Sequence, residues 1–233
     1  MKMKTIGSVI AGAVLLVVQA QATTIPLINP SFEADGTTKI PTGFSTITGW
    51  GAFAPAVTGN ENSGVESDSP PDGVMNAFMD AADTLTQVFP HQTTGYTITG
   101  GQMFQVSYAA KYTYASTGPG GGWSQPISAP EQQEADLYYV SGGAPVVFAS
   151  YVITWDAGGA GVPWANYTFT GVAPSAANGD LLGVDFKNVT TDPNYYNWSE
   201  VDNVGLASVV PEPCSITLLS LGALALVAVR RRS

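Results

Sequence analysis

The stretch Phe104-Gln-Val106-Ser-Tyr108-Ala-Ala110-Lys-Tyr112-Thr-Tyr114 alternates two kinds of side chain. Its even-numbered positions are apolar or aromatic, and its odd-numbered positions are mainly polar. Successive side chains of a strand point to opposite faces of a sheet, so this period of two predicts a strand with one buried and one wet face. The stretch therefore indicates a sheet that packs on a core.

The same alternation extends along the rest of the chain in both directions. Gly, Pro, Asn and Asp clusters separate the segments, as expected of turns. No amphipathic helical period lies between them, which favours an all-β antiparallel sandwich of about eight or more short strands. Besides 104–114, strands are predicted at 74–79, 85–88, 137–140, 146–148, 151–155, 167–169, 182–186 and 202–206.

The charge of the chain is distributed unevenly. Of the 233 residues, 18 are acidic and eight are basic, and five of the basic residues lie near the two ends. Residues 23–209 hold three basic and 17 acidic residues, a net charge of −14. Such a domain repels nucleic acid and anionic membrane surfaces at long range, which disfavours both as partners. The single cysteine, Cys214, excludes an internal disulfide.

The N-terminal 22 residues have the organisation of a secretory signal peptide. Lys2 and Lys4 precede an apolar stretch over 6–18, and Ala20-Gln21-Ala22 provides small residues at the spacing that a signal peptidase accepts. Cleavage is predicted before Thr23. The apolar stretch is shorter than the roughly 20 residues of an ordinary membrane-spanning helix.

The C-terminal segment 210–233 has three parts in order. Val210-Pro211-Glu212-Pro213 comes first, an apolar stretch over 216–229 follows, and Arg230, Arg231 and Arg232 end it. The apolar stretch predicts a short transmembrane helix of roughly 20 Å at about 1.5 Å per residue. The arginines would remain on the cytoplasmic side.

This segment resembles the PEP-CTERM sorting signal of bacterial surface proteins. The resemblance implies recognition by an exosortase and removal of the tail near Pro211-Glu212-Pro213. It also implies transient inner-membrane anchoring, followed by delivery to the cell surface, outer envelope or extracellular matrix with its exopolysaccharide. A plain membrane anchor is the alternative. The chain would thus comprise a signal peptide (1–22), a β-sandwich domain (23–209) and a sorting segment (210–233).

The domain itself resembles the galactose-binding-like jelly roll, a fold that includes many carbohydrate-binding modules. The resemblance rests on Leu27-Ile-Asn29-Pro-Ser31-Phe32-Glu33, Gly49-Trp50, Pro71-Asp72-Gly73 and Val201-Asp202-Asn203-Val204. It implies a structural Ca²⁺ held by Glu33 and Asp202, whose oxygen ligands are the kind that calcium prefers. The alternative is that both acids simply face solvent.

Two polar segments expected to be loops carry aromatic residues that suit a sugar site. The Gly-rich stretch 118–125 contains Trp123, and 192–198 contains Tyr195, Tyr196 and Trp198 among amides. Sugar rings stack on aromatic faces while a few polar groups orient the hydroxyls. These four aromatics are therefore the predicted polysaccharide contacts, with local packing as the alternative. Trp50, Tyr108 and Trp155 are expected in the core.

Catalytic signals are sparse. The single histidine, His91, is expected in a surface loop, and no Gly-x-Ser-x-Gly elbow or zinc-ligand set occurs. The sequence therefore predicts a non-enzymatic, surface-displayed module that binds extracellular polysaccharide. A structural matrix protein without a discrete ligand is one alternative. A glycoside hydrolase remains a second, because acidic residues are abundant.

Overall fold

The computed structural model describes residues 22–36, 43–44, 46–53, 63–80, 89–114, 130–155, 162–190 and 197–210. These ranges belong to one compact unit that spans Ala22–Val210. Residues 1–21 and 211–233 lie outside the described residues, as do Trp123, Tyr195 and Tyr196 and the strand predicted at 85–88.

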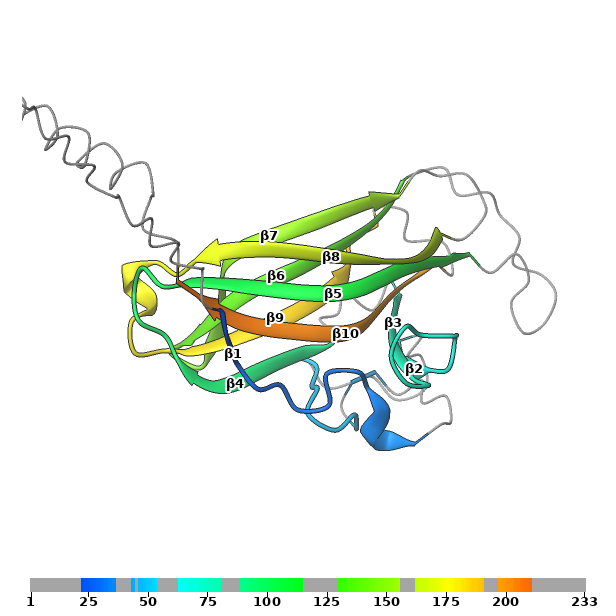
Figure 1. Ribbon diagram of the computed structural model, residues 1–233, viewed down its shortest axis with the longest axis horizontal. Helices are drawn as coiled ribbons and strands as arrows, with labels where there is room; N and C mark the ends of the chain where they lie inside the picture. The colour runs from blue at the N-terminus through cyan, green and yellow to red at the C-terminus, as the bar shows by residue number, and fades with distance from the viewer. Residues whose placement is uncertain are drawn as a thin grey trace, which may run out of the picture. The chain divides into compact units, whose positions relative to one another are not determined.

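The described residues form two antiparallel sheets (Figure 1). The first sheet has the order β2-β3-β10-β5-β8, with β1 paired to β10, and the second has the order β4-β9-β6-β7. The first consists of β1 (Ala22–Thr24), β2 (Gly64–Glu66), β3 (Asn76–Asp80), β5 (Met103–Tyr114), β8 (Val162–Val172) and β10 (Asn197–Val209). The second consists of β4 (His91–Thr97), β6 (Glu131–Ser141), β7 (Ala144–Trp155) and β9 (Leu181–Asn188).

Helix is almost absent from the described ranges. It is limited to two 3₁₀ turns, η1 (Glu33–Asp35) and η2 (Ser175–Ala177). The prediction of an all-β antiparallel sandwich is therefore confirmed. Within these ranges no helix has the length and apolar character needed to cross a membrane, and the predicted helix over 216–229 falls outside them.

The alternating stretch forms strand β5, as predicted. Phe104, Val106, Tyr108, Ala110 and Tyr112 are each at most 2% exposed. They face the second sheet, where the Tyr108 ring meets the Phe186 ring at 5.0 Å. The core is thus the layer between the two sheets, and it includes Trp50 and Trp155 as expected.

Several strands are longer than the sequence predicted. The separate strands expected at 146–148 and 151–155 are one strand, β7, whose pairing with β6 shifts register between Leu137 and Tyr138. An extra residue at that point resets the alternation, so the sequence pattern breaks although the strand continues.

The expectation that His91 lies in a surface loop is wrong. His91 begins strand β4, and it exchanges two backbone hydrogen bonds with Gly51 at 3.0 and 3.1 Å. Its ring is half-buried and stacks on Phe53 with the centroids 3.7 Å apart. β4 reads as polar in the sequence because its buried positions include Gln92 and Thr94 and its exposed positions are Thr and Gly, and pairing with β9 overrides that composition.

Candidate functional site

Trp198, the described member of the four predicted sugar contacts, lies in a strand rather than in a loop. It is the second residue of β10, is half-exposed, and is paired with Asp80 of β3 and Thr113 of β5. Asn197, the first residue of β10, pairs with Tyr114, the last residue of β5. The segments that contain Trp123 and Tyr195 therefore join the sandwich at neighbouring strand ends.

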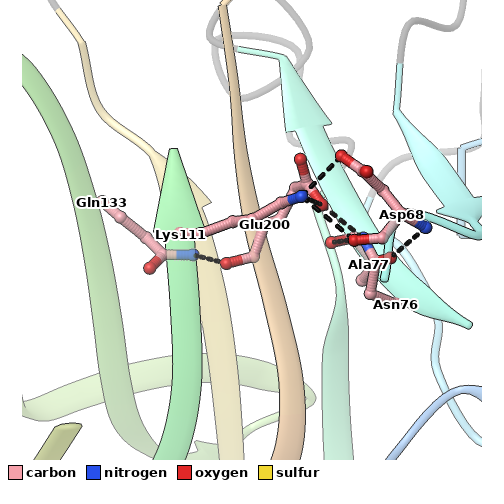
Figure 2. Close-up of polar contacts among 6 residues, drawn as sticks. All are labelled: Asp68, Asn76, Ala77, Lys111, Gln133 and Glu200. Carbon is pink, nitrogen blue, oxygen red and sulfur yellow. Dashed lines mark hydrogen bonds and ion pairs between the residues drawn. The ribbon is translucent and has the colours of Figure 1, made fainter. Parts of the chain in front are cut away.

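A row of polar side chains crosses the outer face of the first sheet (Figure 2). Val201 and Ala110 point into the core, so their neighbours Glu200 and Lys111 project from the opposite face. Lys111 Nζ lies 3.3 Å from Glu200 Oε2 and 2.5 Å from Asp68 Oδ2. Asn76 donates its amide hydrogen to Glu200 Oε2 at 2.7 Å. We call Asn76, Glu200, Lys111 and Asp68 the Lys111 row.

An aromatic side chain on strand β8 extends the Lys111 row. The Lys111 ammonium lies 5.1 Å from the centroid of the Trp164 ring, within the range of a cation–π contact. Trp164 is half-exposed, as is Trp198. The outer face of the first sheet therefore presents two half-exposed indoles: Trp164 lies at the β8 end of the Lys111 row, and Trp198 lies two residues from Glu200 on β10.

The Lys111 row is firmly held. Glu200 is fully buried and Lys111 is 9% exposed. The buried Glu200 carboxylate depends on the Lys111 ammonium for compensation, and Lys111 is compensated by both Glu200 and Asp68. Gln133, from the inner face of β6, donates its amide hydrogen to the Glu200 carbonyl at 3.4 Å. This bond links the second sheet to the strand that carries the row.

Sequence reasoning missed both Trp164 and the Lys111 row. Lys111 was expected to face solvent at a wet position of the 104–114 stretch, yet Asp68, Glu200 and Trp164 surround it. One signal was present, because Lys111 is one of only three basic residues between 23 and 209. A lone basic residue in the middle of a strand of an acidic domain is a candidate for pairing with a buried carboxylate.

Glu33 and Asp202, the two predicted calcium ligands, meet at one turn. Glu33 Oε1 accepts hydrogen bonds from the backbone N–H groups of Val74 and Met75 at 2.7 and 2.6 Å. Asp202 Oδ2 accepts the backbone N–H of Asp72 at 3.0 Å. The turn can approach Glu33 because it contains Gly73, at φ +70°, where a Cβ would lie 2.3 Å from Glu33 Oε1.

The Asp202 carboxyl is in an unusual electrostatic position. It is fully buried, and within the described residues its Oδ1 has no hydrogen-bond partner. Burial, assisted by the nearby charges of Asp72 and Glu33, raises the pKa of Asp202 to about 7, although the backbone N–H groups of Asp72 and Asn203 oppose the shift. A cation beside Oδ1 would favour the charged carboxylate.

The donor set at this turn suits calcium in chemistry but is small. In the ranges that the structure describes, no group of three or more His, Cys, Asp or Glu side chains is arranged to hold a metal ion. Calcium takes six to eight oxygen ligands, and backbone carbonyls and water commonly supply many of them. Glu33 and Asp202 fit the carboxylate part of such a shell, and the unpartnered Asp202 Oδ1 is the atom best suited to a cation.

Comparisons with known proteins identify similar folds. No family model and no curated protein matches the chain. The Stig cyclase Fisc from Fischerella sp. TAU, solved with an indole compound, is 17% identical with a TM-score of 0.54, over 81% of this chain and 98% of that chain. The apo form of a cyclase from Fischerella sp. is 16% identical with a TM-score of 0.52, over 80% and 96% of the two chains.

Carbohydrate-binding modules are also among the similar solved structures. The xylan-binding CBM22-2 domain from Paenibacillus barcinonensis is 15% identical with a TM-score of 0.44, over 77% of this chain and 97% of that chain. A TM-score of 0.44 is too low to bear on function. The structural similarity to the cyclases, at 16–17% identity, shows a shared fold alone. Because one fold hosts many functions, the function has to be argued from the site.

Proposed function

We propose that this chain is an exported, non-catalytic polysaccharide-binding protein whose ligand lies across the outer face of the first sheet. The observation that carries the proposal is the pair of half-exposed indoles, Trp164 on β8 and Trp198 on β10, on one face beside the Lys111 row. Two separated aromatic platforms on a sheet are suited to an extended chain of sugar rings, because each ring presents an apolar C–H face.

The polar groups around the indoles suit a neutral ligand. Lys111 is compensated by Glu200 and Asp68, so the row offers an acidic ligand no free positive charge. Asp68 is accessible, with 44% of its side chain exposed, and it is able to accept hydrogen bonds from hydroxyl groups. The net charge of −14 over residues 23–209 further disfavours uronate-rich chains. Trp123, Tyr195 and Tyr196 are proposed to extend the same surface.

Export and sorting belong to the same proposal. The sequence pattern of residues 1–22 supports cleavage by a signal peptidase. Val210-Pro211-Glu212-Pro213 with Arg230 to Arg232 supports recognition by an exosortase. The protein would pass through the inner membrane and end at the cell surface or in the extracellular matrix, where polysaccharide is abundant. A bound Ca²⁺, held in part by Glu33 and Asp202, would stabilise the 71–75 turn without contacting the ligand.

The test is direct binding by the secreted chain. Isothermal titration and pull-down with neutral polysaccharides, such as xylan and β-glucan, are expected to detect binding that Trp164→Ala and Trp198→Ala each weaken at least about tenfold, a loss of about 1.4 kcal/mol. Val172→Ala is the matched control, because Val172 lies on the same strand as Trp164 but at its far end and is 53% exposed.

Each outcome has a clear meaning. Loss of binding in the two tryptophan variants with an unchanged melting temperature supports the proposal. Binding that neither substitution weakens would move the ligand to another surface. Absence of binding to every neutral and acidic polysaccharide tested would overturn the proposal and favour a structural matrix role.

A further inference from the structure

Two long strands lie at open edges on the same side of the sandwich. In the described part of the chain, β7 pairs only with β6 and β8 pairs only with β5, so each is the last strand of its sheet. The two strands have 12 and 11 residues. They lie side by side, because the Tyr151 ring stacks on the Phe169 ring at 6.0 Å. A Cβ on Gly171 would also lie 2.4 Å from the Cβ of Ala149.

Neither edge strand carries a charged side chain. The sequences APVVFASYVITW of β7 and VPWANYTFTGV of β8 contain no Asp, Glu, Lys, Arg or His. This is unusual in a domain with a net charge of −14 over residues 23–209. Edge strands expose unpaired backbone groups, and monomeric proteins commonly protect them with charges, short length or covering segments.

The opposite edges of the two sheets have such protection. At the far edge of the first sheet, β2 has only three residues and includes Glu66. At the far edge of the second sheet, β4 is covered at His91 by its bridge to Gly51. β7, in contrast, leaves large apolar side chains accessible: Val146, Val147, Tyr151 and Val152 are 39–44% exposed. Tyr151 faces the first sheet, where it stacks on Phe169, and Val152 points to the opposite face, so accessible apolar groups flank the β7 edge on both sides.

We propose that strand β7 is an interface at which two copies of this chain pair antiparallel, which would join the two second sheets across a twofold axis. A twofold axis brings the same strand of two copies together in antiparallel orientation, so one uncharged edge is sufficient. Two domains with the same large negative charge repel over most of their surfaces. The β7 edge is the surface where contact adds little like-charge repulsion.

The β7 strand is long enough for this role. At about 3.4 Å per residue, its 12 residues extend for about 40 Å. The register shift near Tyr138 restricts regular pairing to the part after Phe148, where the exposed Tyr151 and Val152 lie. Pairing there would bury Tyr151 and Val152 against the same residues of the second copy, in addition to forming backbone hydrogen bonds. The proposal is independent of the polysaccharide site, which lies on the outer face of the first sheet.

The first experiment measures the mass of the secreted chain in solution as a function of concentration, by light scattering after gel filtration. The expected result is a dimer that dissociates on dilution. Val152→Lys and Ser150→Lys each place a lysine close to the same lysine of the second copy, and both are expected to raise the dissociation constant at least about tenfold. Leu181→Lys is the matched control, because Leu181 is 41% exposed but lies in β9, which pairs with β4 and β6 on its two sides.

The second experiment tests the geometry. In a Cys214→Ser background, single cysteines are introduced in turn from Ala149 to Thr154 and mildly oxidised. A disulfide needs Cα atoms about 4.4–6.8 Å apart, so crosslinked dimers are expected at one or two positions only, those nearest the twofold axis. Each variant's melting temperature identifies any that fails to fold.

The remaining outcomes count against the proposal. A chain that stays monomeric at every concentration overturns the proposal. A dimer whose dissociation constant neither lysine substitution changes also overturns it, as does a dimer that forms no disulfide crosslink through any cysteine introduced in β7. A monomer in which Val152→Lys weakens polysaccharide binding would also overturn it, and would make the β7 edge a ligand surface instead.

Discussion

Asp136 of β6 and Asp185 of β9 stand directly opposite one another in the second sheet, and both are buried. One ammonium group compensates them: Lys187 Nζ contacts Asp136 and lies 3.2 Å from Asp185 Oδ1. Glu134 also approaches Lys187, at 3.3 Å. Three carboxyl groups thus share a single lysine, and at least one of them gains by holding a proton.

Burial favours the protonated form of the Asp185 carboxyl group. Burial raises the pKa of Asp185 to about 8, the attraction of Lys187 opposes the shift, and the charge of Asp136 adds to it. In the unfolded chain the same group ionises near its ordinary value of about 3.9. The contribution of Asp185 to stability is therefore complete below about pH 4 and is lost as the pH rises toward 8.

Asp185→Asn is expected to remove this loss of stability. The free energy of unfolding of the variant, relative to the wild type, should grow between pH 5 and 8 by at most about 1.4 kcal/mol per pH unit. Urea unfolding at several pH values measures the difference. A difference that is constant over this range would mean that Asp185 is already ionised in the folded protein.

Lys187→Met is expected to destabilise the fold strongly at neutral pH. Burial alone would lower the pKa of Lys187, but the neighbouring Asp185 and Asp136 raise it above its ordinary value, so the ammonium stays charged. Its removal leaves buried carboxyl groups without a counter-charge, at a cost of about 3–5 kcal/mol. Lys187→Arg keeps the charge and should lose much less. Equal urea midpoints for the Met and Arg variants would contradict this account.

Calcium, if it binds beside Asp202, should compete with protons. The pKa of Asp202 is raised to about 7, so the uncharged form predominates in mildly acidic solution. Added Ca²⁺ is therefore expected to raise the melting temperature more at pH 8 than at pH 5.5. Asp202→Asn should abolish this increase. An equal melting temperature with excess calcium or chelator at pH 8 would remove calcium from the proposal.

The strands that fill the core could be predicted from the sequence, and the reason is physical. Two strand segments, 104–112 and 182–186, each bury one face against the other sheet. Their apolar residues therefore recur with a period of two in the amino-acid sequence. That Glu33 and Asp202 lie together was expected only through family resemblance, and their meeting at the 71–75 turn was not expected. The contacts join residues 41 to 130 positions apart, such as Glu33 with Val74 and Asp72 with Asp202, and no local pattern encodes such a contact.

The polar sites on the outer faces could not be predicted in the same way. Lys111 and Asp185 occupy positions that the alternation assigns to solvent, yet both are at most 9% exposed. Glu200 of β10 compensates Lys111 of β5, and Asp185 of β9 lies opposite Asp136 of the neighbouring strand β6. The order of strands in a sheet decides these pairs, and the alternation of one strand holds no information about its neighbours.

Gly183 offers a last prediction, because the Tyr138 side chain covers it. A Cβ at Gly183 would lie 2.1 Å from the Tyr138 ring. The ring is fixed on both sides, by a 2.9 Å hydrogen bond between the Tyr138 hydroxyl and Thr93 and by an edge contact with Phe53 at 5.7 Å. Gly183→Ala would displace the ring, and a loss of about 1–3 kcal/mol in the free energy of unfolding is expected.

Gly95→Ala is the matched control for this prediction. Gly95 lies in β4, and a Cβ there would meet nothing within 4 Å. The substitution is therefore expected to leave stability nearly unchanged or to increase it slightly, because alanine restricts the unfolded chain. Urea unfolding of both variants distinguishes the two glycines. If Gly95→Ala were as destabilising as Gly183→Ala, backbone flexibility of the second sheet, rather than the packing of Tyr138, would explain why glycine occupies position 183.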